Sequence, residues 1–422
     1  MKILLLGSGG REHALAWRLA QSPRCERLFI APGNAGTAQL GTNVALDPND
    51  FEALKKLVVE ENIAMLVVGP EEPLVRGIYD FFQQDEALKQ VKVIGPSKLG
   101  AKLEGSKAFA KQFMLERDIP TAEYAEFTKD SLEEGLLYLA SHPLPIVLKA
   151  DGLAAGKGVL ICQSTAEAQE AFRDMLGGKF GEASQKVIVE AFLEGIEFSV
   201  FVATDGKNYQ ILPVAKDYKR IGEGDSGLNT GGMGAVSPVP FVDEKMMQKV
   251  ANWIISPTLT GLNEIGAAYK GFIFLGLINV DGSPYVIEYN CRLGDPETEV
   301  VIPRLENDLV EFFLAIDAME LGKYELKINP QAAATVVLVS GGYPGDYEKG
   351  KPISGLEGIS DSLVFHAGTK KEAEAVKTNG GRVLAITSYG KDIAEAVQTS
   401  LKNAENIQFE GKYYRRDIGF DV

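Results

Sequence analysis

Residues 1–100 alternate between short apolar runs and longer segments of mixed polarity. The runs KILLLG, RLFIAPG, AMLVVGP and VKVIGP have the length and apolar continuity of buried strands, and the last two end at Gly-Pro. REHALAWRLAQS, between the first two runs, predicts a helix. Strands that alternate with helices are typical of a parallel, doubly wound sheet, so we expect such a domain over residues 1–103.

The pattern changes after this region. EGSKAFAKQFMLERDIP predicts a helix that is capped by Ser106 and stopped by Pro120. PIVLKADGLAAGKGVLI predicts a strand, a glycine-rich loop and a second strand. KVIVEAFLEGIEFSVFVAT predicts two strands around Glu194-Gly195. The polar, glycine-rich stretch 217–240 predicts a long loop.

The rest of the pattern predicts a hairpin and a smaller mixed region. A helix is expected to run to about residue 268, and GFIFLGLINV and SPYVIEYN then form two strands around Asp281-Gly282, a pair typical of tight turns. The strands AAATVVLVSGG and RVLAITSYG predict a C-terminal α+β domain over residues 327–422. The central domain would therefore cover residues 104–326.

Candidate chemistry first emerges in VIEYNCRLGDPETE. Because side chains alternate along a strand, Glu288, Asn290 and Arg292 are expected to share one face. The opposite face carries three residues of ordinary core type, Ile287, Tyr289 and Cys291. A carboxylate and an amide supply the hard oxygens that Mg²⁺ prefers, and the guanidinium can reach a transferring phosphoryl group or an anionic substrate. A solvated strand face or a structural salt bridge is the alternative.

The loop in KADGLAAGKGVL is the second candidate site. Lys149 ends a buried strand, where a lysine is costly unless it meets an anion. Gly152, Gly156 and Gly158 expose backbone N–H groups, and Lys157 is at the tip. The spacing is not that of a P-loop, because a glycine replaces the hydroxyl residue after GK. A flexible flap over a triphosphate fits the pattern, and a plain hairpin loop is the alternative.

The first glycine turn, GSGGRE, is only partly a dinucleotide motif. Gly7 and Gly9 fit G-x-G-x-x-G, but Glu12 occupies the last position, and the second strand ends without an acid for a ribose. NAD and FAD are therefore disfavoured. A glycine turn at a helix N-terminus can still hold a phosphate, and Arg11 favours an anion there. The alternative is a tight strand-to-helix turn.

Composition narrows the class of protein. The chain has 422 residues, 45% of them hydrophobic, and a net charge of −15, which disfavours a nucleic-acid partner. Three distant cysteines and three histidines without metal-ligand spacing argue against disulfides and zinc. The N-terminal apolar run is too short for a signal peptide, and no run is long enough to span a membrane. We expect a cytoplasmic protein.

Several of these segments occur together in one known group of enzymes. Lys107, Lys149, the glycine flap, VEAFLEGIE and the Glu288/Asn290 pair follow the order of ATP-grasp ligases. GSGGREHALAW, LEGSKAF, KADGLAAGKGV, NTGGMGA, NCRLGDPETE, NGGRVL and RRDIG resemble the phosphoribosylamine–glycine ligase (glycinamide ribonucleotide synthetase) family, from Met1 to about Ile418. The resemblance implies an ATP-grasp fold for the central domain, with a small mobile lid at about 125–189.

The resemblance also implies a reaction. ATP, glycine and phosphoribosylamine would give glycinamide ribonucleotide, ADP and phosphate through a glycyl phosphate, in the second step of de novo purine synthesis. ATP and Mg²⁺ or Mn²⁺ would be the cofactors, and the partners would be small molecules bound by a monomer. An acyl phosphate needs no protein nucleophile, which agrees with a sequence that suggests no Ser-His-Asp arrangement. Catalysis would rest on positioning and charge neutralisation.

Individual roles follow from matching motifs. The residues expected to bind the nucleotide are Lys107, Lys149, Gly152, Gly156, Lys157, Gly158, Glu190, Phe192, Leu193 and Glu197. The residues expected to bind the other substrates are Gly9, Gly10, Arg11, Glu71, Lys219, Arg220, Asn229, Thr230, Gly231 and Arg292. The metal ligands would be Glu288 and Asn290, and the catalytic residues would be Arg292, Lys149 and Asp295.

The chain departs from the wider superfamily in one respect. GFIFLGLINV carries no acid, although many ATP-grasp enzymes place a further carboxylate on that strand, so a second metal site is in question. Another ATP-grasp carboxylate–amine ligase, such as a formate-using relative, is the nearest alternative, and RLGDPETE and NTGGMG disfavour it. An inactive nucleotide-binding module is opposed by Lys149, Glu288, Asn290 and Arg292. A fused multifunctional enzyme is not expected, because the chain ends shortly after RRDIG.

Overall fold

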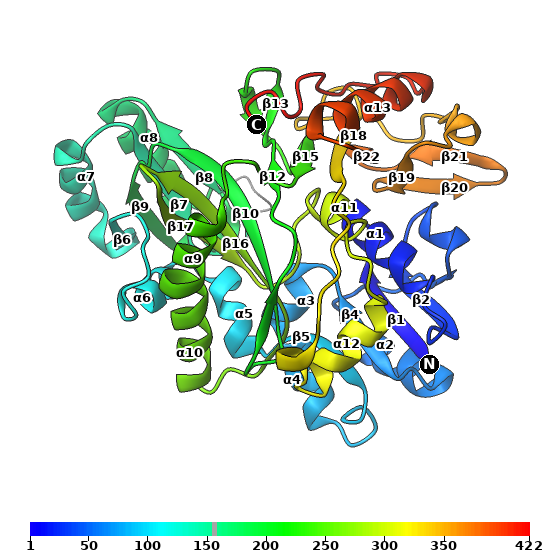
Figure 1. Cartoon of the computed structure of the whole chain (residues 1–422). Helices are drawn as coiled ribbons and strands as arrows, with labels where there is room; N and C mark the ends of the chain where they lie inside the picture. Colours follow the sequence, from blue (N-terminus) through cyan, green and yellow to red (C-terminus); the bar gives the residue numbers. More distant parts are fainter. Residues whose placement is uncertain (154–157) are drawn as a thin grey trace.

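The four apolar runs at the N-terminus form the parallel sheet that their pattern predicts. The computed structural model describes residues 1–153 and 158–422 (Figure 1). The strand order is β3-β2-β1-β4-β5, with every pair parallel. The elements are β1 (Lys2–Gly7), α1 (Gly10–Leu19), β2 (Arg27–Pro32), β3 (Thr42–Asn43), α2 (Phe51–Glu61), β4 (Met65–Val68), α3 (Glu71–Arg76), α4 (Ile78–Gln84) and β5 (Lys92–Pro96).

Both faces of this sheet are buried, as a doubly wound fold requires. Leu4 and Leu6 of β1 pack in one hydrophobic core with residues of α2, α3 and α4. Ile3 and Leu5, on the other face of the strand, pack in a second core with α1 and α12 (Leu309–Asp317). Consecutive residues of one strand thus enter different cores, which explains why the run is continuously apolar.

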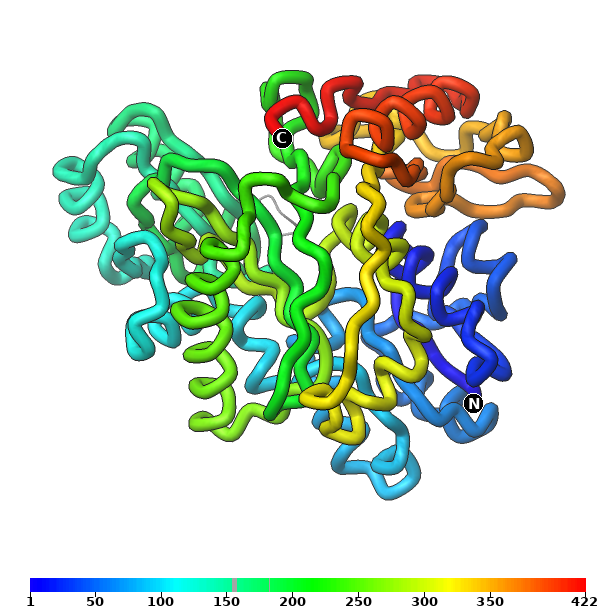
Figure 2. Tube along the Cα trace, viewed as in Figure 1, coloured from blue at the N-terminus to red at the C-terminus, as the bar shows by residue number. Residues whose placement is uncertain are grey.

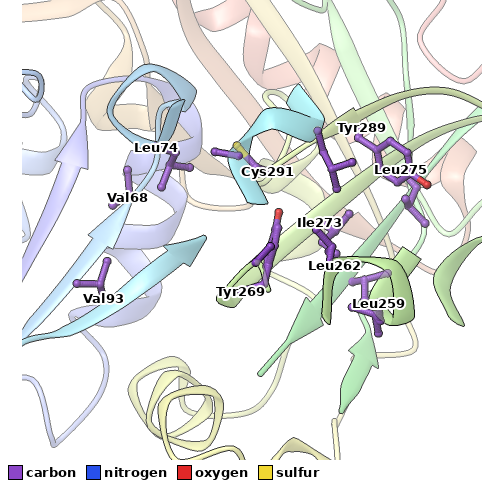
Figure 3. Close-up of a cluster of buried hydrophobic side chains, with 14 of the residues drawn as sticks. Val68, Leu74, Val93, Leu259, Leu262, Tyr269, Ile273, Leu275, Tyr289 and Cys291 are labelled. Carbon is purple, nitrogen blue, oxygen red and sulfur yellow. The ribbon is translucent and has the colours of Figure 1, made fainter. Parts of the chain in front are cut away.

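The sheet does not end with the first domain. β16 (Tyr269–Val280) pairs antiparallel with β5 through Tyr269 and Lys270, and the sheet continues through β10 (Ile196–Thr204) to β11 (Tyr209–Ile211). β17 (Ser283–Asn290) forms the predicted hairpin with β16, and the turn residues Asp281 and Gly282 both have positive φ. Figure 3 shows the core under this junction, where Val68, Leu74 and Val93 approach Tyr269, Ile273 and Cys291. The shared core places the first glycine turn and the β16–β17 hairpin in one packed unit.

A separate sheet lies inside the stretch expected to form the lid. Its order is β6-β9-β7-β8, and it has its own hydrophobic core with α7 (Leu132–Ser141) and α8 (Thr165–Leu176). The strands are β6 (Tyr124–Thr128), β7 (Ile146–Ala150), β8 (Val159–Cys162) and β9 (Lys186–Ala191). This group projects from the rest of the chain at the left of Figure 1. That it moves as a lid stays a prediction.

The helices between these sheets begin largely where their caps predict. The expected helix after residue 104 is α6 (Lys107–Leu115), which follows α5 (Lys98–Gly105), and Ser106 Oγ accepts a hydrogen bond from Phe109 N at 3.1 Å. The later helix comprises α9 (Glu244–Val250), a π-helical turn and α10 (Ser256–Glu264). It ends before residue 268, because Gly266 takes φ +70°. Among the described residues, none of the helices has both the length and the apolar character needed to cross a bilayer.

The prediction of a long loop at 217–240 is wrong. The stretch contains the short strands β12 (Lys216–Asp217), β13 (Arg220–Gly222), β14 (Ser226–Asn229) and β15 (Gly234–Ser237). β15 pairs with the distant strand β18, so the local pattern could not reveal it. The C-terminal sheet has the order β12-β15-β18-β22-β19, and α13 (Ile393–Asn406) packs on it. Its other strands are β18 (Ala332–Val339), β19 (Leu363–His366) and β22 (Arg382–Gly390).

Two buried histidines join the first domain to the C-terminal sheet. His366 N donates to His13 Nδ1 at 2.6 Å, and Asn34 Nδ2 donates to His366 O at 2.7 Å. Burial, together with the neighbouring His366, lowers the pKa of His13 to about 3, and burial lowers that of His366 to about 4. Because an unfolded histidine titrates near pH 6.5, the unfolded chain binds protons below that pH that the folded chain excludes. The histidine contribution to the free energy of unfolding therefore falls as pH decreases.

We predict that His13→Asn reduces this loss, since the asparagine Oδ1 can also accept from His366 N. Between pH 7.5 and 5, the free energy of unfolding of the wild type should fall by about 2 kcal/mol more than that of the variant. Glu297, whose pKa is raised to about 7 by burial, acts in the opposite direction over this range, but equally in both proteins. Denaturant unfolding at several pH values measures the difference. Equal pH slopes would show that His13 does not contribute.

Candidate active site

The strand that carries the candidate metal ligands contains an irregularity. Glu288 pairs with Gly276, but Val286 already pairs with Leu277, so Ile287 is an extra residue in β17. The predicted alternation is therefore wrong at Ile287, which is only half-buried, whereas Val286 is in the core. The bulge leaves the Ile287 carbonyl free to accept a hydrogen bond from Lys149 Nζ at 3.2 Å. Because β17 ends at Asn290, Arg292 lies in the segment beyond the strand.

Glu288 and Asn290 fit a metal bound together with a nucleotide. Asn290 is 9% exposed, and neither side chain has a hydrogen-bond or ion-pair partner among the described residues. Gly276 faces Glu288, and a Cβ there would come within 3.0 Å of Glu288 Cγ. Within the described residues, no three carboxylate, histidine or cysteine side chains are grouped to hold a metal. Two protein oxygens that leave other positions to phosphates and water suit Mg²⁺.

The buried lysine at the end of β7 meets a carboxylate. Lys149 Nζ lies 2.9 Å from Glu190 Oε2, and Lys111 Nζ lies 3.2 Å from the same atom. Burial lowers the pKa of Lys111 to about 8. Burial would raise the pKa of Glu190, but the two lysine charges lower it below its usual range. Glu190 Oε1 is buried without a hydrogen-bond partner among the described residues.

Lys111 was not predicted from the sequence. The available signal was its position one helical turn after Lys107 in α6, which places both lysines on one side of the helix. Glu190 was expected to bind the nucleotide, which stays a prediction, and its side chain pairs with two lysines. Phe192, two residues further on, leaves 41% of its surface exposed between the lid sheet and β10, and Leu193 beside it is half-buried.

We predict that Glu190→Gln destabilises the protein by about 3 kcal/mol, because it leaves two buried lysines without a counter-charge. Glu126→Gln is the matched control, since Glu126 also pairs with a lysine in the lid sheet, but at a part-exposed position. The control should cost less than about 1 kcal/mol. Denaturant unfolding measures both. Equal small losses would mean that Glu190 is not needed to stabilise the lysine pair.

The root of the flap is fixed to the start of α6. Lys107 N donates to Asp151 O at 3.1 Å, and Lys107 Nζ donates to Gly152 O at 3.3 Å. The Asp151 carboxylate accepts from Ala108 N at 2.7 Å. Burial lowers the pKa of Lys107, and the charge of Glu288 partly offsets this effect. Gly158 O accepts from Ala150 N on the far side of the flap, whereas Gly156 and Lys157 lie outside the described residues.

Arg292 is held by two carboxylates. Its Nη2 lies 2.7 Å from Glu104 Oε1, and its Nε lies 3.3 Å from Glu71 Oε2. Burial would lower the pKa of Arg292, but these carboxylates raise it well above its ordinary value. Glu104 was missed by sequence reasoning, because it looks like an ordinary helix-end residue, yet it also accepts a hydrogen bond from Cys291 N. The guanidinium is therefore fixed just beyond the end of the β16–β17 hairpin.

The first glycine turn encloses a carboxylate. Glu12 Oε2 accepts from Gly9 N at 2.7 Å, and Glu12 Oε1 lies 2.5 Å from Arg11 Nε. A Cβ on Gly7 would come within 2.4 Å of Glu12 Cγ. The glycine therefore makes room for a protein side chain, which explains why the dinucleotide motif is broken. Arg11 is 8% exposed, and it also donates to Leu293 O at 3.1 Å.

Asp295 connects the first domain to the C-terminal sheet. Its Oδ2 accepts from Arg11 N at 3.3 Å, and its Oδ1 lies 2.9 Å from Arg382 Nη1. Arg382, which begins β22 and was not predicted, also donates to Gly231 O at 2.6 Å. A Cβ on Gly10 would collide with Glu299, whose Oε2 is buried without a partner among the described residues. These contacts favour a positioning role for Asp295, and its predicted catalytic role stays a prediction.

The residues chosen from the 217–240 stretch come together on a hairpin. Arg220 and Asn229 are paired across β13 and β14, and Thr230 N donates to Lys219 O at 2.7 Å. Lys219 Nζ lies 2.8 Å from Glu197 Oε2, so the base of the hairpin contacts a residue expected to bind the nucleotide. The charge of Lys219 lowers the pKa of Glu197.

Two further acids, Asp217 and Glu297, lie near the sheet face that carries Glu288. Ser199, Gly276 and Glu288 are direct neighbours across β10, β16 and β17, so they share one face, with Ser199 and Glu288 about 10 Å apart. Ser199 Oγ donates to Glu297 Oε1 at 3.1 Å. Burial and the nearby Asp217 raise the pKa of Glu297 to about 7, and burial raises that of Asp217. Neither acid was predicted. Asp217 comes from a distant segment, and Glu297, although it lies in the VIEYNCRLGDPETE stretch, contacts Ser199 of β10, which no local pattern reveals.

Models of one known family match nearly the whole chain. Three models of phosphoribosylglycinamide synthetase match the chain, the N domain at residues 1–104, the ATP-grasp (A) domain at 105–298 and the C domain at 333–421. The chain belongs to the phosphoribosylglycinamide synthetase family. The family and the fold class predicted from the sequence are thereby confirmed.

Individual relatives of this phosphoribosylglycinamide synthetase family member cover its whole length. The phosphoribosylamine–glycine ligases of Haemophilus influenzae and Pasteurella multocida are each 47% identical to it, over 100% of this chain and 98% of theirs. The crystal structure of the Thermotoga maritima phosphoribosylamine–glycine ligase superposes with a TM-score of 0.85 at 37% identity, covering 99% of this chain and 100% of that one. An ADP complex of N5-carboxyaminoimidazole ribonucleotide synthetase, at 17% identity and a TM-score of 0.66, shares the fold.

Proposed function

We propose that this protein uses ATP to join glycine to phosphoribosylamine, which gives glycinamide ribonucleotide, ADP and phosphate in purine biosynthesis. The observation that carries the proposal is a pair of oxygen donors, Glu288 and Asn290, which have no partner among residues 1–153 and 158–422 and lie beside a guanidinium fixed by Glu71 and Glu104. The full-length relatives that are named as this ligase support the same reading.

The chemistry requires activation of a carboxylate. An amine does not usefully attack a carboxylate, whereas glycyl phosphate carries a good leaving group, so ATP would first phosphorylate glycine. Mg²⁺ or Mn²⁺ held by Glu288 and Asn290 would neutralise phosphate charge. Lys107 and Lys149 would hold the phosphates, with the flap from Gly152 to Gly158 above them. The segment Glu190–Leu193 would hold the adenine, and Glu197 would lie near the ribose.

The acidic groups near Ser199 suit the ammonium group of glycine. Glycine has a carboxylate and an ammonium, and Asp217 and Glu297 supply acidic groups close to Ser199, which shares a sheet face with Glu288. Arg292 would steady the acyl phosphate, and the ammonium would face Asp217 and Glu297. A formate-using relative would have no need of such an acidic group, so this feature favours glycine.

Phosphoribosylamine would bind at the first domain. The N-terminus of α1 offers the N–H group of Gly10, and Arg11 and Glu71 lie on the same side as Arg292. Lys219, Arg220, Asn229, Thr230 and Gly231 would close the acceptor site from the hairpin side. We also propose the domain boundaries 1–103, 104–326 and 327–422, a lid at about 125–189, and a monomeric cytoplasmic enzyme.

An ADP-release assay with freshly prepared phosphoribosylamine tests the proposed function. We expect ADP only when glycine, phosphoribosylamine and a divalent metal are all present, and no turnover when formate replaces glycine. Rapid turnover with formate would favour the alternative ligase. An enzyme that binds ATP but turns over none of these combinations would be an inactive nucleotide-binding module.

Arg11→Ala tests whether phosphoribosylamine and ATP bind at different sites. We predict an increase of about 10-fold or more in the KM for phosphoribosylamine, because a charged contact to a phosphate is lost, with an unchanged Kd for ATP. Steady-state kinetics and ATP titration measure the two effects. If the affinity for ATP falls as much as that for phosphoribosylamine, the glycine turn belongs to the nucleotide site, and the assignment of the first domain must be abandoned.

A further inference from the structure

The C-terminal tail contacts the β13–β14 hairpin through one buried guanidinium. In Figures 1 and 2 the red end of the chain lies beside the green hairpin. Arg415 in the RRDIG motif is fully buried, and its Nη1 donates to Asp225 Oδ1 at 2.6 Å and to Arg220 O at 3.1 Å. Its Nε and Nη2 grip the two oxygens of Asp417 at 2.8 and 2.7 Å. One side chain thus joins the tail to both the turn and the first strand of the hairpin.

Other tail residues extend this contact along the hairpin. Asp417 Oδ2 accepts from Gly224 N at 2.7 Å, and Tyr413 OH donates to Ile221 O at 3.0 Å. Arg416 N donates to Glu223 Oε1 at 3.2 Å. Beyond the hairpin base, Tyr218 OH donates to Asp421 Oδ1 at 2.8 Å, and Lys216 pairs with the same carboxylate. The tail therefore lies against β12, β13 and the turn that joins β13 to β14.

The two strands of the hairpin are held only weakly by each other, although Ile221 of β13 packs against the C-terminal core. β14 is exposed along its whole length, and the pairing between β13 and β14 is irregular. An isolated two-stranded hairpin is only marginally stable in water, so its position depends on what holds it. The Arg415 guanidinium fixes the turn of the hairpin. At the other end of the hairpin, Lys219 forms an ion pair with Glu197, a residue proposed to bind the nucleotide.

We propose that Arg415 is a positioning residue that holds the β13–β14 hairpin over the acceptor side of the active site. The inference rests on the proposed function for the identity of the acceptor substrates. Arg415 itself touches no substrate, and its effect passes through Arg220 O and Asp225 to the hairpin, which carries Lys219 and Asn229. The C-terminal motif would thus contribute to acceptor binding and not only to folding.

Asp225→Asn is the most direct test of this positioning role. It weakens the contact between Arg415 and the hairpin turn and leaves the two hydrogen bonds from Arg415 to Asp417 intact. We expect the KM for phosphoribosylamine or glycine to increase about 10-fold, with the Kd for ATP and the Tm nearly unchanged. Asp361→Asn is the matched control, since Asp361 also forms a part-exposed ion pair on the C-terminal domain and lies outside the hairpin contact. It should have no kinetic effect.

Arg415→Lys is the second variant, because lysine keeps the charge and loses the two-pronged grip. Hydrogen exchange gives a readout that does not depend on activity: amides at 220–229 should exchange faster in both variants, whereas those of the lid sheet should not change. Unchanged exchange at 220–229 would overturn the inference even if the proposed reaction failed. Faster exchange with wild-type KM values in an active enzyme would overturn it while leaving the proposed function intact.

Discussion

Glu288→Gln should lower kcat for the complete reaction by about 10²–10³-fold without unfolding the protein. The change removes the charge from one of the two oxygen ligands, and Glu288 has no partner among the described residues that would be left unpaired. The apparent affinity for Mg²⁺, measured from the metal dependence of ADP release, should fall together with kcat. The free energy of unfolding should stay close to that of the wild type.

Asp281→Asn is the control for Glu288→Gln. Asp281 lies in the turn of the same hairpin at φ +48°, a conformation that asparagine also adopts readily. It removes the same charge without touching the site and should leave activity unchanged. Near-normal activity and normal metal dependence in Glu288→Gln would show that this strand face is structural.

Arg292→Lys is expected to cause a loss of kcat of similar size, about 10²-fold or more, while ATP binding stays within a few-fold of the wild type. Glu104 contacts the guanidinium at 2.7 Å and Glu71 contacts it at 3.3 Å. These two contacts fix the orientation of its remaining N–H groups. An ammonium keeps the charge but cannot contact both carboxylates in that geometry while it also binds an acyl phosphate.

Steady-state ADP release and direct ATP titration without the acceptor substrates measure the two quantities. Arg27→Lys is a suitable control, because Arg27 forms a part-exposed ion pair with Glu61 within the first domain and was not assigned to the candidate site. If Arg292→Lys reduced ATP binding as strongly as kcat, Arg292 would belong to the nucleotide site and would not act on the acyl phosphate.

The parts of the fold set by local patterns could be predicted from the sequence. Continuous apolar runs gave the parallel strands, and Asp281-Gly282 marked the hairpin turn. The bulge at Ile287 could not be predicted, because it depends on the register between two strands. The strands within 217–240 were missed for a similar reason, since β15 finds its partner about a hundred residues further along the chain.

The same limit applies to the candidate site: its local motifs could be predicted, but its long-range contacts could not. Motifs singled out Lys149, Glu288 and Arg292, but they did not show what holds each side chain. Glu104 contacts Arg292, Lys111 contacts the Glu190 carboxylate that also pairs with Lys149, and Arg382 contacts Asp295. These side-chain contacts join distant segments, so no local spacing records them. Gly156 and Lys157, predicted to be in the flap, lie outside the described residues, so their role stays a prediction.

An isotope experiment tests the central claim most directly. Glycine labelled with ¹⁸O in both carboxylate oxygens is supplied with ATP, metal and phosphoribosylamine, and the released phosphate is analysed by mass spectrometry. If glycyl phosphate forms, one labelled oxygen passes from glycine to each phosphate, and the other stays in the amide of the product. Phosphate free of label, released together with glycinamide ribonucleotide, would contradict the account.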